Sequence, residues 1–255
     1  NSLIELFVSS SLRVSICCLG VVLSSLTTQA APVVNWVIDQ GTPVASGMNT
    51  DSPTVGDGTS ENADAVIFHS DFPAITLGNS GESIVLTGSV TLVGITSSMQ
   101  NFRFALFDRQ GSPDVNGWLG YFVANSAGTS AGVIRQRNAD NTDLFLSNNG
   151  ATIVASTNAE PHSDTNVAFP DGTYTFTLQI TRDEDNYDIS AELSGPGEVF
   201  HDTFEIQDLA PALTEQFRFD NVGFLIGNGL NVDQAQFSNI NVTFIPEPGT
   251  SLLLT

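Results

Sequence analysis

The segment Thr173 to Arg182, TYTFTLQITR, decides the fold class because its apolar side chains recur at every second position. Its even-numbered residues up to 180 are apolar and its odd-numbered ones polar: Tyr174, Phe176, Leu178 and Ile180 against Thr173, Thr175, Thr177, Gln179 and Thr181. A period of two places these sets on opposite faces of a β-strand. The segment therefore predicts an antiparallel strand with one buried and one solvated face.

The same period recurs along the rest of the chain. Asn186 to Leu193 repeats it, and Asp183-Glu184-Asp185 predicts a hairpin loop between the two runs. In the last run the step from Phe237 to Ile240 predicts a β-bulge at Ser238-Asn239. No amphipathic helix is indicated after residue 31. About a dozen such runs predict an all-β fold, an antiparallel two-sheet β-sandwich, in a single domain over residues 32–245.

The order of these runs resembles concanavalin A-like (laminin G-like) jelly rolls. The resemblance rests on the Trp118-Leu119-Gly120-Tyr121 strand, the hairpin carrying Tyr174 and Tyr187, and the run Phe219 to Phe224. It implies a closing strand, Ala235 to Phe244, that pairs back toward Val33 to Ile38. The resemblance concerns the fold, since one fold supports many functions.

Net charge excludes several partners. The 255 residues include 28 Asp and Glu against 7 basic residues, all arginine, which gives a net charge of −21. Without a basic stripe the chain is not expected to bind nucleic acid or anionic membranes. The hydrophobic content of 41% excludes a disordered acidic tail.

Residues 1–31 have the pattern of a secretory signal peptide. Arg13 precedes a short apolar run that extends to Leu26, and small residues follow up to Ala30 and Ala31. Cleavage is expected near Ala30 or Ala31; a buried N-terminal helix is the alternative. Cys17 and Cys18, the two cysteines of the chain, lie within this segment, so the mature domain would contain neither disulfides nor thiolate metal sites.

Residues 246–255 resemble the start of a PEP-CTERM sorting signal, a bacterial tail recognised by an exosortase. Pro246, Glu247 and Pro248 match the triad of that signal, and Ser251 to Leu254 match the beginning of its apolar helix. The rest of the helix and the basic cluster of the family pattern do not follow, so these residues are interpreted as the start of a truncated tail. The alternative is a strand that simply ends in proline. The resemblance implies delivery to the cell surface or the extracellular matrix, with transient membrane contact through the tail.

Residue spacing favours a non-catalytic protein. Glycosidases with related folds carry Glu-x-Asp-x-x-Glu on one strand, and no glutamate of this chain has aspartate two positions later. His69, His162 and His201 are scattered, so each is expected at the surface or at a sheet edge rather than in a zinc site. A secreted glycoside hydrolase or lyase is the alternative, because separated carboxylates can converge in space.

Calcium is the candidate ion because hard cations bind oxygen ligands. The hairpin residues Asp183, Asp185, Asn186 and Asp188 are candidate metal ligands, with a solvated acidic loop as the alternative. A sugar site would need an exposed aromatic ring and nearby polar groups. The candidates for carbohydrate binding are Trp118, Tyr121, Asn116, Asn125, Arg135 and Arg137, the alternative being that both rings belong to the core.

Together these patterns predict an exported surface or exopolysaccharide-matrix protein. Polysaccharide is the expected ligand if the domain is a weak glycan-binding module. A purely structural matrix component is the competing hypothesis. The glycan-binding hypothesis requires converging polar side chains on one sheet face, and the structural hypothesis does not.

Overall fold

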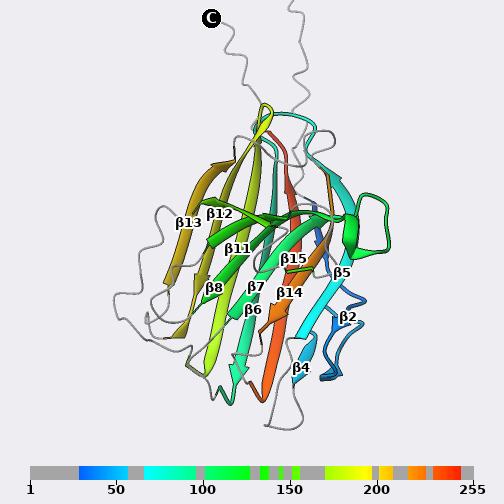
Figure 1. Ribbon diagram of the computed structural model, residues 1–255, viewed down its shortest axis with the longest axis vertical. Helices are drawn as coiled ribbons and strands as arrows, with labels where there is room; N and C mark the ends of the chain where they lie inside the picture. The colour runs from blue at the N-terminus through cyan, green and yellow to red at the C-terminus, as the bar shows by residue number, and fades with distance from the viewer. Residues whose placement is uncertain are drawn as a thin grey trace, which may run out of the picture.

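The structure, a computed structural model, consists of two stacked antiparallel β-sheets (Figure 1). It describes residues 29–56, 66–95, 101–126, 133–137, 144–145, 151–155, 170–196, 201–208, 218–227 and 232–247. The helical element that lies wholly within these residues is a short 3-10 turn, η1 (Val115–Gly117). The described part of the chain contains no helix with the length and hydropathy needed to cross a membrane.

The eight-stranded sheet has the order β13-β12-β11-β6-β15-β4-β3, with β1 paired to another part of β15. Its strands are β1 (Gln29–Pro32), β3 (Val44–Ser46), β4 (Thr54–Gly56), β6 (Ser83–Val93), β11 (Gly172–Asp183), β12 (Asn186–Ser194), β13 (His201–Asp208) and β15 (Gln234–Ile245). The segment Thr173 to Arg182 lies in β11, near the centre of this sheet. There Leu178 pairs with Leu86 of β6 and with Ala191 of β12.

The seven-stranded sheet has the order β10-β9-β8-β7-β14-β5-β2. Its strands are β2 (Val37–Gln40), β5 (Val66–Thr76), β7 (Asn101–Asp108), β8 (Leu119–Ser126), β9 (Val133–Arg137), β10 (Ala151–Ala155) and β14 (Arg218–Ile226). Strand β14 lies near its centre, between β7 and β5. The predicted all-β, two-sheet architecture is confirmed.

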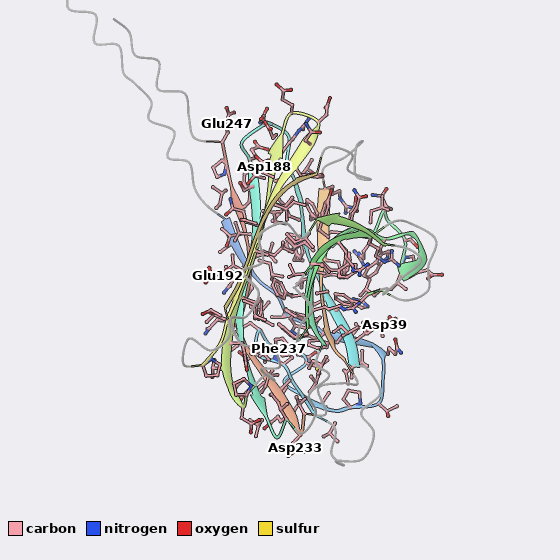
Figure 2. The ribbon with its side chains drawn as sticks, turned by 60° about the vertical axis from the view of Figure 1, so that its left-hand side comes forward. Asp39, Asp188, Glu192, Asp233, Phe237 and Glu247 are labelled. Atoms are coloured by element: carbon pink, nitrogen blue, oxygen red, sulfur yellow. The ribbon has the colours of Figure 1, made fainter. Side chains whose placement is uncertain are left out.

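Phe224 of β14 is the centre of an aromatic core between the sheets. Its ring centroid lies 4.7 Å from that of Phe237, 5.3 Å from Phe176 and 5.5 Å from Phe68. These four residues come from β14, β15, β11 and β5, so both sheets contribute. Figure 2 shows Phe237 between the two layers. Such ring pairs add to the stabilisation that area burial provides.

Two local predictions are confirmed and a third is displaced by a few residues. The β11–β12 hairpin turns at Glu184-Asp185, and β15 shifts register between Ser238 and Asn241, where Asn239 has a φ of 54°. The closing strand β15 pairs with β1, directly before the predicted 33–38 segment, and the main-chain nitrogen of Val33 also donates to the oxygen of Ile240 at 3.4 Å. Val37 and Ile38 instead pair with β5 in the other sheet, where Ile38 packs against the core.

Strand β1 contains the expected cleavage positions of the predicted leader. Ala30 pairs with Thr243 and Ala31 with Val242, whereas the first fully buried core residue is Val33. The predicted leader otherwise lies outside the described residues, and so does the tail beyond Glu247.

We expect Phe224→Ala to lower the free energy of unfolding by about 3–5 kcal/mol, because it leaves a cavity among rings from both sheets. Urea denaturation followed by tryptophan fluorescence measures this loss. Phe244→Ala is the control, because Phe244 is only partly buried against the same core, and it should cost less than half as much. Equal losses for both variants would contradict the central position of Phe224.

Candidate functional site

The outer face of the seven-stranded sheet carries a second apolar cluster. Phe107, Phe122 and Phe145 pack there, with the Phe145 ring 5.7 Å from each of the other two. Gly223 of β14 makes room for this layer, since a Cβ on Gly223 would lie 3.1 Å from Phe107 and 3.2 Å from Phe145. Much of this face is therefore covered by the protein itself.

The two aromatic candidates for a sugar platform are buried. Trp118 and Tyr121 do lie on opposite faces of the sheet, as their spacing suggests: Trp118 belongs to the outer cluster and Tyr121 to the core between the sheets. Their exposed fractions are 1% and 0%. Tyr121 packs edge-on against Tyr187 at 5.5 Å. Neither ring presents a face to a ligand, because each one fills a hydrophobic cluster.

The predicted polar partners of these rings do not gather around them. Arg137 is fully buried and donates a hydrogen bond to the main-chain oxygen of Trp118. Arg135 is half-buried in β9, opposite Phe122. Asn116 lies in η1 and Asn125 in β8, but their side chains lie outside the described part of the structure. The described residues of this set form a structural support rather than a binding site.

A polar row on the outer face of the seven-stranded sheet is the candidate site. It consists of His69 and Asp71 of β5, Asn221 of β14, and Arg109, which follows β7. His69 and Asp71 are two positions apart and so share a face, and Asn221 is paired directly with Asp71. The sequence alone predicts His69 at the surface or at an edge and does not single out the other three residues.

Asp71 is held through both of its carboxylate oxygens. Oδ1 accepts a hydrogen bond from Asn221 Nδ2 at 2.8 Å, and Oδ2 forms an ion pair with Arg109 Nη1 at 2.7 Å. The Asp71 side chain is nevertheless 54% exposed, and that of Arg109 is 31% exposed. The carboxylate is thus oriented by the protein while solvent or a ligand can still reach it.

A buried ionic cluster anchors Arg109. Asp220 accepts hydrogen bonds from the main-chain nitrogen of Arg109 at 2.9 Å and from Arg218 Nη2 at 2.7 Å. Arg218 also contacts Asp108 at 2.6 Å. Burial raises the pKa of Asp108, while hydrogen bonds from Gln110 and the Arg218 charge oppose that rise. Removing one partner from such a buried cluster is destabilising because a charge is left uncompensated.

The hydrogen bonds of Asn221 assign the tautomer of His69. Asn221 Nδ2 lies 3.2 Å from His69 Nδ1 and 2.8 Å from the Asp71 carboxylate. An amide nitrogen can only donate, so the imidazole Nδ1 accepts and the ring proton is on Nε2. The opposite orientation of the amide would place its oxygen against the carboxylate.

The surroundings of His69 keep the ring neutral. Burial lowers its pKa below the ordinary value, and the negative charges of Asp39 and Asp71 oppose this shift while Arg109 adds to it. The ring packs edge-on against Trp118, with the centroids 5.0 Å apart. The row therefore combines the Asp71 carboxylate, an acceptor, with the Arg109 guanidinium, a donor, beside the His69 ring. A hydroxyl group on a ligand both donates and accepts, so it can bond to groups of either kind.

The predicted calcium ligands lie on the β11–β12 hairpin and do not form a cluster. Asp183 and Asn186 form the last cross-strand pair, Asp185 is in the turn, and Asp188 points outward from β12 (Figure 2). Among the described residues no three Asp, Glu, His or Cys side chains are grouped so that they could hold a metal ion. The residues present therefore do not fit a calcium site, because such a site needs several converging oxygen ligands.

No protein-family model matches the chain, and no curated protein matches it in sequence. Solved structures with a similar fold include arcelin-5, a lectin-like defence protein from Phaseolus vulgaris, at 15% identity and a TM-score of 0.45 over 86% of this chain and 96% of its own. Basic winged bean lectin is 9% identical, with a TM-score of 0.49 over 88% and 99%. An endo-1,3-beta-glucanase from Streptomyces sioyaensis is 14% identical, with a TM-score of 0.45 over 83% and 90%. These are similarities of strand arrangement, and the function of this chain has to be argued from its own residues.

The neutral state of His69 predicts a pH-dependent stability. A partly buried histidine with a lowered pKa binds fewer protons in the folded than in the unfolded state, so stability is full above about pH 6.5 and falls below it. We expect the Tm of the wild type to drop more between pH 7.5 and pH 5.5 than that of His69→Gln. Glutamine can accept from Asn221 and does not titrate, while all carboxylates titrate in both proteins. Parallel pH profiles for the two proteins would contradict this assignment.

Proposed function

We propose that this chain is an exported, non-catalytic protein of a cell surface or exopolysaccharide matrix that binds polysaccharide through the polar row of His69, Asp71, Arg109 and Asn221. The half-exposed Asp71 carboxylate, held by Asn221 and Arg109, carries the proposal. Groups that are oriented before binding lose less entropy when a ligand arrives. Ionised acceptors also form stronger hydrogen bonds to hydroxyl groups than neutral ones do.

The engagement of Asp108 and Asp220 supports the non-catalytic version. A glycosidase needs two carboxyl groups at the scissile bond, one of them protonated so that it can act as an acid. Asp108 has a raised pKa, but it is fully buried and its oxygens are bound by Arg218 and Gln110. Asp220 is likewise buried between Arg218 and Arg109. Of these three described carboxylates, Asp71 is the one that a ligand can reach.

The proposed route to the cell exterior uses both ends of the chain. Residues 1–31 would act as the leader, and Pro246-Glu247-Pro248 would begin a tail processed by an exosortase, with transient membrane contact. Ala30, next to which cleavage is expected, pairs with Thr243, three residues before Pro246, so both ends of the domain lie together on the same sheet. Pro246 follows directly after β15, and Glu247 is exposed there.

A glycan-array screen of the exported chain tests the binding proposal. We expect a reproducible polysaccharide class to bind, and Asp71→Asn to weaken that binding by roughly tenfold or more, because a charged hydrogen bond to a hydroxyl group is lost. Asp188→Asn is the matched control, since Asp188 is an exposed aspartate on the outer face of the other sheet. Binding should be unchanged by EDTA, given the absence of a metal cluster among the described residues.

Three results would contradict the proposal: no binding to any glycan, equal weakening by Asp71→Asn and Asp188→Asn, or loss of binding in EDTA. Release of reducing sugar from a bound polysaccharide would show the alternative, a secreted glycoside hydrolase. Release of an unsaturated product would show a lyase.

A further inference from the structure

The outer face of the eight-stranded sheet carries a regular grid of hydroxyl groups. On the central strand β11, Thr173, Thr175 and Thr177 point outward, and on β6 Thr87, Ser89 and Thr91 lie directly opposite them. All six are at least partly exposed. Hydroxyl groups on such a sheet repeat at about 4.7–4.9 Å across strands and about 6.8 Å along them.

The bulge in β15 extends this grid to a third strand. Ser238 is paired with Ser89, and after the register shift Asn241 is paired with Thr87. The left-handed backbone of Asn239, with a φ of 54°, absorbs the additional residue. Without the shift one of these two polar side chains would face the core. The bulge therefore keeps both polar side chains on the outer face.

The grid is almost free of charge in a strongly acidic protein. Among all the residues of β6, β11 and β15, Arg182 and Asp183 alone are charged, and both lie at the hairpin end of β11. The next strand, β12, carries the acidic residues Asp188 and Glu192 on the same side (Figure 2). With a net charge of −21 for the whole chain, this neutral area is a local exception.

Hydrogen bonds between neighbouring strands orient the hydroxyl groups. Thr91 Oγ1 lies 2.9 Å from Thr173 Oγ1, and Ser89 Oγ lies 2.8 Å from Ser238 Oγ. One such bond uses one donor and one acceptor, so the Thr91–Thr173 pair keeps a second hydrogen and several lone pairs for a ligand. In the Ser89–Ser238 pair the Ser89 hydroxyl also donates to the main-chain oxygen of Ser238 at 3.5 Å, so this pair offers lone pairs. The side chains are ordered before binding, which lowers the entropy cost of contact.

We propose that this hydroxyl grid, formed by the outward residues of β6, β11 and β15, binds the flat face of an extended, uncharged polysaccharide. Such a surface presents hydroxyl groups that both donate and accept, as the grid does. An anionic polymer would be repelled by the acidic surroundings, and a cationic one would find no partner on β6, β11 or β15 except Asp183. The grid and the Asp71 row lie on different sheets, so this proposal does not rest on the proposed function.

Retention on microcrystalline cellulose and on chitin particles tests the proposal with the full exported chain. We expect depletion of the wild type from solution that persists at high salt, and much weaker retention on carboxymethylated cellulose. The double variant Thr87→Val/Thr177→Val removes two directly opposite hydroxyl groups while keeping side-chain shape. It should reduce retention on cellulose or chitin roughly tenfold, since each lost hydrogen bond contributes modestly.

Two control variants test whether retention depends on the hydroxyl grid itself. Thr76→Val, an exposed threonine of β5 in the other sheet, should leave retention unchanged. In the Asp71→Asn background the double variant should cause the same fold loss of retention, so that failure of the grid and failure of the polar row give different results. The proposal is overturned if neither solid retains the wild type, or if a correctly folded double variant is retained equally. It is also overturned if sedimentation shows that the same double variant disrupts a dimer, because the grid would then be a self-association surface.

Discussion

The aromatic core around Phe224 is the interaction on which the rest of this structure depends. Phe224 contacts rings from β5, β7, β11 and β15, so it joins the centres of both sheets. With the sheets fixed against each other in this way, their two outer faces are positioned as rigid surfaces. The outward-pointing residues, which alternate with core residues along each strand, then determine the chemistry of each outer face.

One local irregularity determines the polar row. Phe219 and Val222 both belong to the core although they are three positions apart, and the β5–β14 register shifts between Phe219 and Asn221. This shift turns Asn221 outward, where it meets Asp71. Pro73 of β5 lies opposite the irregularity and cannot donate a ladder hydrogen bond there. Bulges that re-aim a side chain in this way are frequent next to functional sites.

The fold was predictable because alternation is a local signal. The hairpin turn at Glu184-Asp185 and the bulge at Ser238-Asn239 follow from spacing alone. The exact residues that pair with β15 were not predictable, since strand pairing depends on contacts between distant segments. The burial of Trp118 could not be predicted either. It depends on Phe145, which is distant in sequence and packs in the same cluster on the outer face of the seven-stranded sheet. The polar row joins residues from three separate strand regions, and the outward spacing of His69 and Asp71 was its one local sign.

The chain has a net charge of −21. Within it the His69 ring is neutral and belongs to the polar row, whereas the hydroxyl grid is nearly free of charge and forms a separate surface. The central claim is that the polar row is ordered before any ligand binds. Nitrogen NMR of the imidazole of His69 at neutral pH tests this claim most directly. We predict a neutral ring with the proton on Nε2 and an unprotonated Nδ1. A ring with the proton on Nδ1, or a doubly protonated ring, would contradict the claim, because Asn221 could then not orient both His69 and Asp71.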